Sequence, residues 1–348
     1  MKPILLTPHS SLLTKKNLLA FSAGIDSSAL FFLLLENNIK FDIAIVDYGI
    51  RAQSKAEVAH AKDLAKEHKL YCHTITAPKF EANFEKQARD FRYAFFESLI
   101  ASEGYDTLLT AHQLNDQLEW FLMRLSKGAG VSELVGMEPV VQKEGYTLIR
   151  PLLEYTKADL LAYLKSHSHP YFVDESNADA KHERNHFRKT FADSLLAAYS
   201  EGIRRSFTYL REEKKRLESD FEMITKIQSL RILKLHTPKA KSKAADVTLK
   251  QLGYLLSAAQ RKEIAGKDSL VIGRKWAVAY QEGLLYIAPY LSTDMPKDFK
   301  ERCRVNKIPP KIRPYLFEAE IDLKQIYQSI SVGCCPPTTP KHQIQNRP

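Results

Sequence analysis

Residues 21–28, which read Phe-Ser-Ala-Gly-Ile-Asp-Ser-Ser, have the composition of a loop that binds phosphate. Small residues let a backbone turn sharply and approach a ligand closely. The serines would open the next helix, whose unpaired N–H groups and positive dipole end attract anions. The alternative is an ordinary strand-to-helix turn in which Asp26 is a solvated cap. The phosphate-binding positions that this pattern predicts are Ser22, Ala23, Gly24, Ile25, Asp26, Ser27 and Ser28.

A second group of polar residues stands where later strand-like runs end and the next helix would begin. Carboxylates near a triphosphate suit Mg²⁺, which takes one or two carboxylates together with phosphate oxygens. Each acid also has a simpler interpretation as a helix cap, and both roles can hold at once. The residues at these positions are Asp47, His112, Asn115, Asp116 and Glu119.

Two arginines lie three residues apart in an amphipathic run at 84–102. In a helix Arg89 and Arg92 share a face, and there they could hold phosphate or carboxylate. The alternative is a solvated basic face.

These groups need a frame that brings them together, and the first half of the sequence supplies one. Apolar β-branched runs alternate with helix-like runs at the spacing of βαβ units. The strand-like runs are 17–21, 41–47, 70–75 and 107–110, and the helix-like runs are 27–36, 52–68, 84–102 and 114–127. We therefore predict an α/β fold with a doubly wound parallel sheet. Such sheets bind ligands at the carboxyl ends of their strands, where the loop, Asp47 and His112 all fall.

The pattern changes after Gly128-Ala129-Gly130. A hairpin-like segment follows, and then a helix is expected at about 156–166. One or two long helices are expected over 200–235, followed by a small α+β unit at 246–290. The last fifteen or so residues are expected to be disordered.

Composition and charge narrow the class of protein. The 348 residues suggest about two domains, and 44% hydrophobic with 26% charged residues is ordinary for a globular protein. A net charge of +10 favours a polyanionic partner, either nucleic acid or an acidic membrane surface. The longest apolar run, 29–35, is far shorter than the roughly 20 residues of a membrane span. The first sixteen residues lack the apolar core of a signal peptide.

The cysteines indicate reduced thiols and a cytoplasmic protein. No C-x-x-C pair exists, and two adjacent cysteines do not have the usual spacing of zinc ligands. The four are Cys72, Cys303, Cys334 and Cys335.

Six short motifs in order resemble those of the tRNA(Ile)-lysidine synthetases, a family of PP-loop ATPases. They are S-x-G-x-D-S at 22–27, V-D-x-G-x-R at 46–51, A-R-x-x-R-Y at 88–93, A-H-x-x-x-D-Q-x-E at 111–119, R-P-L-L at 150–153, and D-x-S-N followed by R-N-x-x-R within 174–188. The match covers about 17–190. The sequence departs at Ala23, where the pattern has Gly, at Gln113, where many members have His, and at Trp120, where Thr is common. A positive φ at Ala23 would strain the loop.

The resemblance implies a reaction. The family uses ATP to adenylate the cytidine at the first anticodon position of tRNA(Ile), and then joins the ε-amine of free lysine to C2. The loop would hold the β- and γ-phosphates, and Asp26 and Asp116 would hold Mg²⁺. Arg89, Arg92 or Arg188 would stabilise the transferring α-phosphate.

The remaining implied roles concern lysine. Asp174 or Glu119 would bind its ammonium group, and His112 could remove a proton from the attacking amine. Asn177 and Arg184 complete the implied substrate-binding set.

The basic segment at 181–216 has ten Lys or Arg against five Asp or Glu, a net of +5. With an RNA substrate, we expect it to contact phosphates and to bind more weakly at high salt. The alternative is a solvated charged helix.

The predicted organisation is a PP-loop catalytic domain at 1–200, a tRNA-contacting region at 201–335 that is helical and then α+β, and a disordered tail at 336–348. The expected partners are tRNA(Ile) with a CAU anticodon and free L-lysine, with no membrane; a homodimer is left open. One rival is another PP-loop enzyme such as a tRNA thiolase, which needs a sulfur-carrying cysteine. The other is a non-catalytic RNA-binding protein with a decayed ATP loop.

Overall fold

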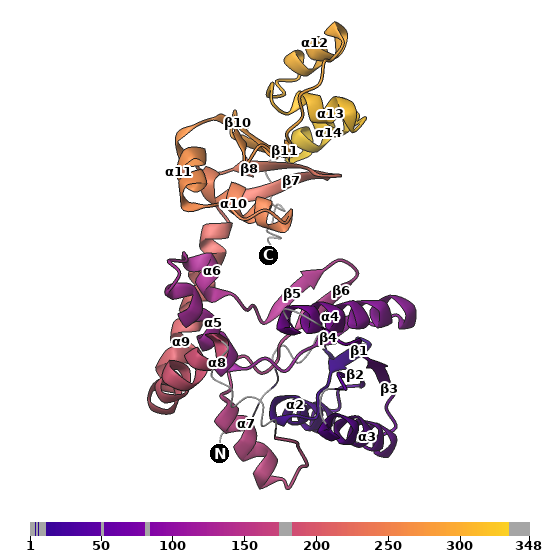
Figure 1. Cartoon of the computed structure of the whole chain (residues 1–348). Coiled ribbons are helices and arrows are strands. Elements are labelled where there is room, and N and C mark those ends of the chain that lie inside the picture. Colours follow the sequence, from indigo (N-terminus) through magenta and orange to yellow (C-terminus); the bar gives the residue numbers. More distant parts are fainter. Residues whose placement is uncertain are drawn as a thin grey trace, which may run out of the picture. The chain divides into compact units, whose positions relative to one another are not determined.

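The chain folds into two units, each with a sheet and a core of its own (Figure 1). The computed structural model describes residues 4, 6, 12–49, 52–80, 84–173 and 183–333. The two units are Met1–Lys214 and Lys215–Pro348. Their division lies inside a long helix, whereas the boundary expected from the sequence was at 200/201.

The first unit is built on a six-stranded sheet in the order β3-β2-β1-β4-β6-β5. Its strands are β1 (Asn17–Ala20), β2 (Phe41–Asp47), β3 (Cys72–Thr76), β4 (Thr107–Leu109), β5 (Val140–Lys143) and β6 (Tyr146–Ile149). All neighbours pair in parallel except β5, which forms an antiparallel hairpin with β6. The chain winds outward from β1 to β3 and then returns to β4, on the other side of β1. This arrangement confirms the predicted doubly wound fold and places the switch between β1 and β4, where such sheets bind ligands.

Alternating residues give this sheet two apolar faces, as expected for a parallel sheet covered on both sides. Leu18 and Leu108 face one core, while their neighbours Leu19 and Leu109 face the other. Figure 1 shows α2 and α3 on one face and α4 on the opposite face. The helices that cover the sheet are α2 (Ile25–Glu36), α3 (Ala52–Glu67), α4 (Phe84–Glu103) and α7 (Lys157–Ser166).

A helical layer, drawn partly from between β4 and β5 and partly from after α7, packs beside the sheet. It consists of α5 (Leu114–Leu125), α6 (Val131–Val135), α8 (Glu183–Phe187), the π-helical turn η2 (Arg188–Ala192) and the first part of α9 (Asp193–Glu218). Its small core joins Leu114 and Leu118 of α5 to Leu196 and Phe207 of α9. This packing fixes α8 and η2 against the start of α5.

The second unit is an antiparallel sheet in the order β7-β8-β11-β10-β9, with helices packed on each of its faces. The strands are β7 (Phe221–Ile227), β8 (Leu230–Leu235), β9 (Ser269–Ile272), β10 (Trp276–Gln281) and β11 (Leu284–Pro289). The turn η3 (Pro238–Ala240), α10 (Lys241–Gln251) and α11 (Ala258–Gly266) precede β9, and α12 (Lys297–Val305), α13 (Arg313–Glu318) and α14 (Leu323–Gly333) follow β11.

The expectation of one or two long helices over 200–235 is wrong after residue 218. The segment from Phe221 to Leu235 forms the β7–β8 hairpin instead. Gln228 in its turn adopts a positive φ of 50°, which a continuous helix would not allow. Burial between the two helical layers lets the β-branched and aromatic residues here pair as strands. Within the described ranges, no helix has the length and apolar character needed to cross a membrane.

Candidate active site

Serine hydroxyl groups hold the turn between β1 and α2. The backbone N–H of Ser22 donates to Ser27 Oγ at 3.2 Å, and the hydroxyl oxygens of these two serines are 3.1 Å apart. The Ser28 hydroxyl donates to the Ala23 carbonyl at 3.1 Å. Gly24 is the N-cap of α2 and has no side chain to cap the first N–H groups. Those N–H groups are therefore suited to an anion, as the sequence predicted.

Ala23 adopts a left-handed backbone conformation with φ of 57°. The positive φ is the one that the family's glycine would adopt without strain. For alanine this left-handed conformation costs about 1–2 kcal/mol of conformational free energy. The methyl group of Ala23 is fully buried in the core beneath the loop. Its carbonyl also accepts a hydrogen bond from Phe172 N at 2.9 Å. Packing and this bridge hold the loop in its strained turn.

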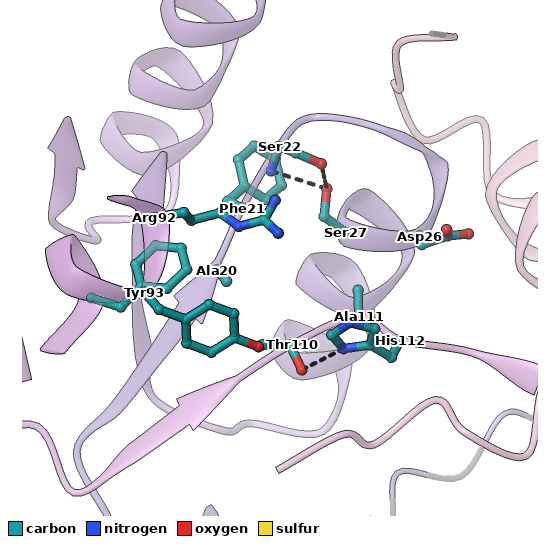
Figure 2. Close-up of a pocket in the computed structure, with 11 residues that line it drawn as sticks. Ala20, Phe21, Ser22, Asp26, Ser27, Arg92, Tyr93, Thr110, Ala111 and His112 are labelled. Carbon is teal, nitrogen blue, oxygen red and sulfur yellow. Dashed lines mark hydrogen bonds between the residues drawn. The ribbon is translucent and has the colours of Figure 1, made fainter. Parts of the chain in front are cut away.

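A pocket of about 180 Å³ opens between this loop, α4 and the end of β4 (Figure 2). Its lining brings together residues that are up to 92 positions apart, from Ala20 to His112. The lining residues are Ala20, Phe21, Ser22, Asp26, Ser27, Arg92, Tyr93, Phe96, Thr110, Ala111 and His112. The structure thus places five predicted site residues, namely Ser22, Asp26, Ser27, Arg92 and His112, around one cavity. A cationic side chain, a carboxylate and an imidazole share this space.

Asp26 carries a carboxylate with an unmet hydrogen-bonding need. Its Oδ1 atom is buried and has no hydrogen-bond partner. Burial is the main cause that raises its pKa from 3.8 to about 6, and the negative charge of Asp116 adds to the effect. Lys157 and Arg188 act in the opposite direction. A buried carboxylate oxygen without a partner costs free energy until a cation or a donor reaches it.

His112 is held neutral at the edge of the pocket. Its Nδ1 lies 2.9 Å from the hydroxyl of Thr110, which orients the ring. Burial lowers the pKa of His112 to about 4, and the cations Arg150, Arg184 and Arg92 lower it further, against the opposing effect of Asp116. The ring is therefore free to accept a proton at neutral pH, although a lowered pKa makes it a weak base.

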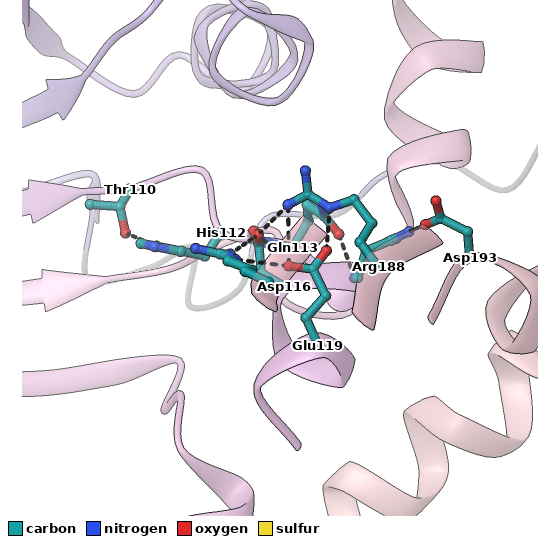
Figure 3. A network of polar contacts seen from close by, with 9 residues as sticks. Thr110, His112, Gln113, Asp116, Glu119, Arg188 and Asp193 are labelled. Atoms are coloured by element: carbon teal, nitrogen blue, oxygen red, sulfur yellow. Dashed lines mark hydrogen bonds and ion pairs between the residues drawn. The ribbon is translucent and has the colours of Figure 1, made fainter. Parts of the chain in front are cut away.

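Four charged side chains form a network at the start of α5 (Figure 3). Glu119 is fully buried and accepts from Arg184 Nε at 2.8 Å and from Arg188 Nη2 at 3.2 Å, with a further hydrogen bond from Arg188 Nε. Asp116 Oδ1 accepts from Arg184 Nη2 at 2.5 Å. Despite burial, the two carboxylates raise the pKa of both arginines. Two buried carboxylates are thus paired with two guanidinium groups in the protein itself.

The network is anchored by the cap of α5. Gln113 is the N-cap, and its backbone N–H donates to Asp116 Oδ2 at 3.1 Å in a capping box. The alternative role of Asp116 in a helix cap is thus confirmed, although Asp116 is the third residue of the capping box and the N-cap residue itself is Gln113. Asn115 does not cap the helix but bonds to two other helices. Its side-chain N–H donates to Asp193 Oδ1 at 2.9 Å, and its side-chain oxygen accepts from the backbone N–H of Lys157. These bonds tie α5 to both α7 and α9.

Other predicted residues lie outside the pocket lining. Asp47 Oδ1 accepts from Gly49 N at 2.8 Å and from the Ser54 hydroxyl at 2.9 Å, which is the bonding of a turn. Arg89 is exposed and stacks on the Tyr93 ring at 5.6 Å. Asp174 and Asn177 fall outside the described residues.

Comparison with known proteins assigns the chain to a family. A family model described as a PP-loop domain matches residues 5–195. The tRNA(Ile)-lysidine synthase of Campylobacter jejuni is 46% identical over 89% of this chain and 95% of its own length. The corresponding proteins of Wolinella succinogenes and Helicobacter pylori are 45% and 44% identical over 92% and 87% of this chain, and 98% and 89% of theirs.

The chain belongs to the tRNA(Ile)-lysidine synthase family. The PP-loop of the family corresponds here to the turn between β1 and α2, which contains the strained Ala23. The acidic motif of the family corresponds to Asp116 and Glu119 in α5, which belong to the charged network.

Two basic residues near the site had no predicted role. Arg150 follows β6, and its partly buried guanidinium donates through Nη1 to the Glu138 carbonyl at 2.8 Å, while its Nε has no partner. Burial lowers the pKa of Arg150. Lys157 is the first residue of α7, where the helix dipole disfavours a cation. That unfavourable position was the one signal in the sequence that could have identified Lys157.

Several cations of the basic segment at 181–216 form ion pairs with acids of the same chain. Arg184 and Arg188 bind Asp116 and Glu119, as described above. Arg204 Nε donates to the Glu154 carbonyl at 2.5 Å, and Lys214 pairs with Glu138 at 2.5 Å. The exposed cations of α9 are Arg205, Lys215 and Arg216. The expected phosphate-contacting surface is therefore smaller than the sequence count implied.

Proposed function

We propose that this chain ligates lysine to tRNA(Ile) with a CAU anticodon, using ATP. The C2 oxygen of the cytidine at the first anticodon position attacks the α-phosphate of ATP, and pyrophosphate leaves. The ε-amine of free L-lysine then attacks C2, AMP leaves with that oxygen, and the amine loses a proton. The products are lysidine in the RNA, AMP and pyrophosphate. We expect this reaction in the cytoplasm.

The observation that carries this proposal is the near full-length match to named tRNA(Ile)-lysidine synthases, which reaches 95% of the Campylobacter jejuni protein. A partial match would have left open whether only the ATP-binding fold is shared. The assembly of the loop, His112 and α5 at one edge of the sheet supports the same proposal, because ATP and a base oxygen must meet there.

The phosphates of ATP would bind at the loop side of the pocket. The uncapped N-terminus of α2 offers N–H groups for the β- and γ-phosphates. Arg92 lines the pocket and supplies a cation where negative charge develops at the α-phosphate. Lys157 acts on Asp26 from the first turn of α7 and is a further candidate for a phosphate contact.

Asp26 fits a role in holding Mg²⁺. Its buried Oδ1 lacks a partner, and Mg²⁺ needs one or two carboxylates because it retains water and phosphate oxygens as its other ligands. In the described part of the chain, no three His, Cys, Asp or Glu side chains gather as a metal-binding group, which agrees with a metal shared with ATP. When bound, Mg²⁺ would neutralise phosphate charge. Asp116 could join only by giving up part of its bond to Arg184.

The lysine ammonium would bind on the α5 side of the site. Glu119 is the described acid best suited to it, since it is buried and already holds cations. Lysine would share or displace a guanidinium, and Arg188, once released, could reach a phosphate. Asp174 stays a candidate by resemblance. His112 is neutral and can accept a proton from the amine, with the low efficiency that its pKa of about 4 implies.

The thiolase alternative is not favoured. The described cysteines are Cys72 and Cys303, and burial raises the pKa of both thiols. A raised pKa keeps a thiol protonated and unreactive. The homodimer stays a prediction.

The test is AMP release from ATP, measured with and without lysine, on unmodified tRNA(Ile) with a CAU anticodon and on tRNA(Met) as control. We expect AMP only with tRNA(Ile), and radiolabelled lysine in the RNA. AMP without lysine incorporation would indicate another nucleophile. The absence of AMP with either RNA would support the non-catalytic RNA-binding protein.

A further inference from the structure

Two series of side chains run along α8, η2 and the start of α9, each with a spacing of four residues. The inner series faces α5 and consists of Arg184, Arg188, Ala192 and Leu196. The outer series lies one position earlier along most of its length and consists of Phe187, Phe191, Leu195 and Tyr199. We call the outer series the aromatic stripe.

The aromatic stripe is exposed although the helix already has a complete buried face. Phe191, Leu195 and Tyr199 are 42%, 37% and 66% exposed, and Phe187 is half-buried. The core beneath is filled by Ala192, Leu196 and other residues of the inner side. Apolar side chains that are not needed for the core and gather on a surface mark a binding site.

Ring contacts give the first part of the stripe a defined shape. The centroids of Phe187 and Phe191 are 5.5 Å apart, and the His186 ring stands nearly perpendicular to Phe191 at 5.9 Å and 88°. The hydroxyl of Thr190 lies 3.3 Å from His186 Nδ1. The three rings thus support one another and present aromatic surface outward.

A backbone irregularity lies within the stripe. Residues 188–192 form a π-helical turn, in which Asp193 N donates to the Arg188 carbonyl, five residues back. Such turns cost stability and are frequent at functional sites. Arg188 belongs to the same turn and binds Glu119, so the turn joins the stripe to the site network.

The chemistry of the surroundings indicates which partner covers the stripe. Several cations of the segment at 181–216 are bound in internal ion pairs, but Lys189 within the π-helical turn and Arg205 farther along the same helix are exposed. An aromatic surface within a basic segment is the combination that binds single-stranded nucleic acid, by stacking of bases and attraction of phosphates. A partner helix would instead need an apolar groove flanked by charges of either sign.

We propose that the aromatic stripe, centred on Phe187 and Phe191, stacks an unpaired base of the anticodon loop and so holds that loop open beside Glu119. The inference rests on the proposed function, because it takes the anticodon loop as the substrate. It adds the surface that separates the target cytidine from its neighbours. Phe187 and Phe191 are binding residues here and take no part in the chemistry.

The experiment measures RNA binding by the full-length protein without ATP or lysine. The probe is an anticodon stem-loop of tRNA(Ile) with 2-aminopurine beside the target cytidine, since this base is quenched when it stacks on an aromatic ring. Phe191→Ala is compared with Phe191→Tyr, which keeps a ring, and with Tyr71→Ala. Tyr71 is a matched control because it is 75% exposed and precedes β3, at the opposite edge of the sheet.

We expect Phe191→Ala to raise the Kd about 10-fold or more and to abolish the protein-dependent quenching. Phe191→Tyr should restore both, and Tyr71→Ala should behave as wild type. The slope of log Kd against log salt should stay unchanged in Phe191→Ala, whereas loss of one phosphate contact, as in Arg205→Ala, would lower it by about 0.7. Circular dichroism shows whether Phe191→Ala is folded. If it is not, Phe187→Ala is used in its place for the same measurements.

Three results would overturn the inference. The first is wild-type binding and quenching in both Phe191→Ala and Phe187→Ala. The second is a change in salt slope instead of quenching, which would mean a phosphate contact. The third is reduced self-association of Phe191→Ala with unchanged RNA binding, which would make the stripe a contact between two copies of the chain. Failure of wild type to ligate lysine is a separate result that contradicts the proposed function.

Discussion

The two sides of the candidate site satisfy their charged groups in opposite ways. On the loop side, Asp26 has a buried oxygen without a partner, and the turn is held by serine hydroxyls and a strained Ala23. On the α5 side, Asp116 and Glu119 are bonded to two arginines. On the loop side one carboxylate oxygen is left for a ligand to bind, whereas on the α5 side both acids are paired within the protein.

This difference separates acids that already stabilise the fold through ion pairs from an acid with a buried oxygen that has no partner before a ligand binds. Breaking a buried ion pair leaves an uncompensated charge and destabilises a protein. Removing a buried carboxylate that has no partner relieves a cost instead. The same chemical change, an acid to its amide, should therefore have opposite effects on stability at the two positions.

The largest effect is expected for Glu119→Gln. The substitution keeps the shape of the side chain but leaves Asp116 as the one carboxylate within 4 Å of Arg184 and Arg188 among the described residues. We expect a loss of about 3 kcal/mol in unfolding free energy, because the charge that balances two partly buried cations is gone. Urea denaturation followed by circular dichroism measures it. Glu183→Gln, which affects an exposed ion pair with Lys127 in the same unit, is the control and should cost less than about 1 kcal/mol. Equal losses would contradict the comparison.

Asp26→Asn should act in the opposite direction on stability. Its raised pKa of about 6 means that the ionised form is disfavoured in the fold, so the amide should stabilise the protein by about 3 kcal/mol at pH 8. At the same time AMP formation should fall by about 100-fold or more, because the proposed Mg²⁺ ligand is lost. Thermal unfolding and AMP release are measured on the same sample. A destabilised Asp26→Asn would show that the carboxylate has a structural partner.

The pH dependence of that difference sharpens the comparison. Because the pKa of Asp26 is raised in the folded state, its contribution to stability is complete below pH 3.8 and is lost as the pH rises to about 6. The unfolding free energies of wild type and Asp26→Asn should therefore diverge between about pH 4 and 6, by about 1.4 kcal/mol per pH unit, and run parallel above. Taking the difference cancels the acids that the two proteins share. A difference independent of pH would mean that Asp26 titrates normally.

Sequence patterns predicted the parts of this site that are local. The strand-to-helix turn at 21–28 and the acids at the start of α5 each lie within one short segment, so spacing alone indicated their position. Motif order further placed Arg92 and His112 near the loop. The sheet was predictable for the same reason, because alternating apolar runs fix both its strands and its two faces.

The pairing of charges was not predictable, because it joins distant segments. Arg184 and Glu119 are 65 positions apart, and nothing in either motif shows that they bind each other rather than a substrate. The expected helix beyond residue 218 failed for a related reason. Its residues form strands because helices from 238–333 cover them on both sides. The free energy gained by burying them in a sheet is larger than their local preference for a helix.

The smallest effect is expected at Ala23, where the sequence has Ala in place of the family's Gly and the structure has a positive φ. Ala23→Gly relieves about 1–2 kcal/mol of backbone strain, but it loses a buried methyl group worth about 0.8 kcal/mol and gives the unfolded chain about 0.4–1 kcal/mol of entropy. These terms nearly cancel, so stability should change by less than about 1 kcal/mol. Ala23→Val, which puts a β-branched side chain at a φ of 57°, should be clearly destabilising. The pair is compared by urea denaturation and by the KM for ATP. If Ala23→Gly proved strongly destabilising, the buried methyl group rather than the serine hydroxyls would be what holds the loop, and the loop side would then resemble the α5 side in being built for stability.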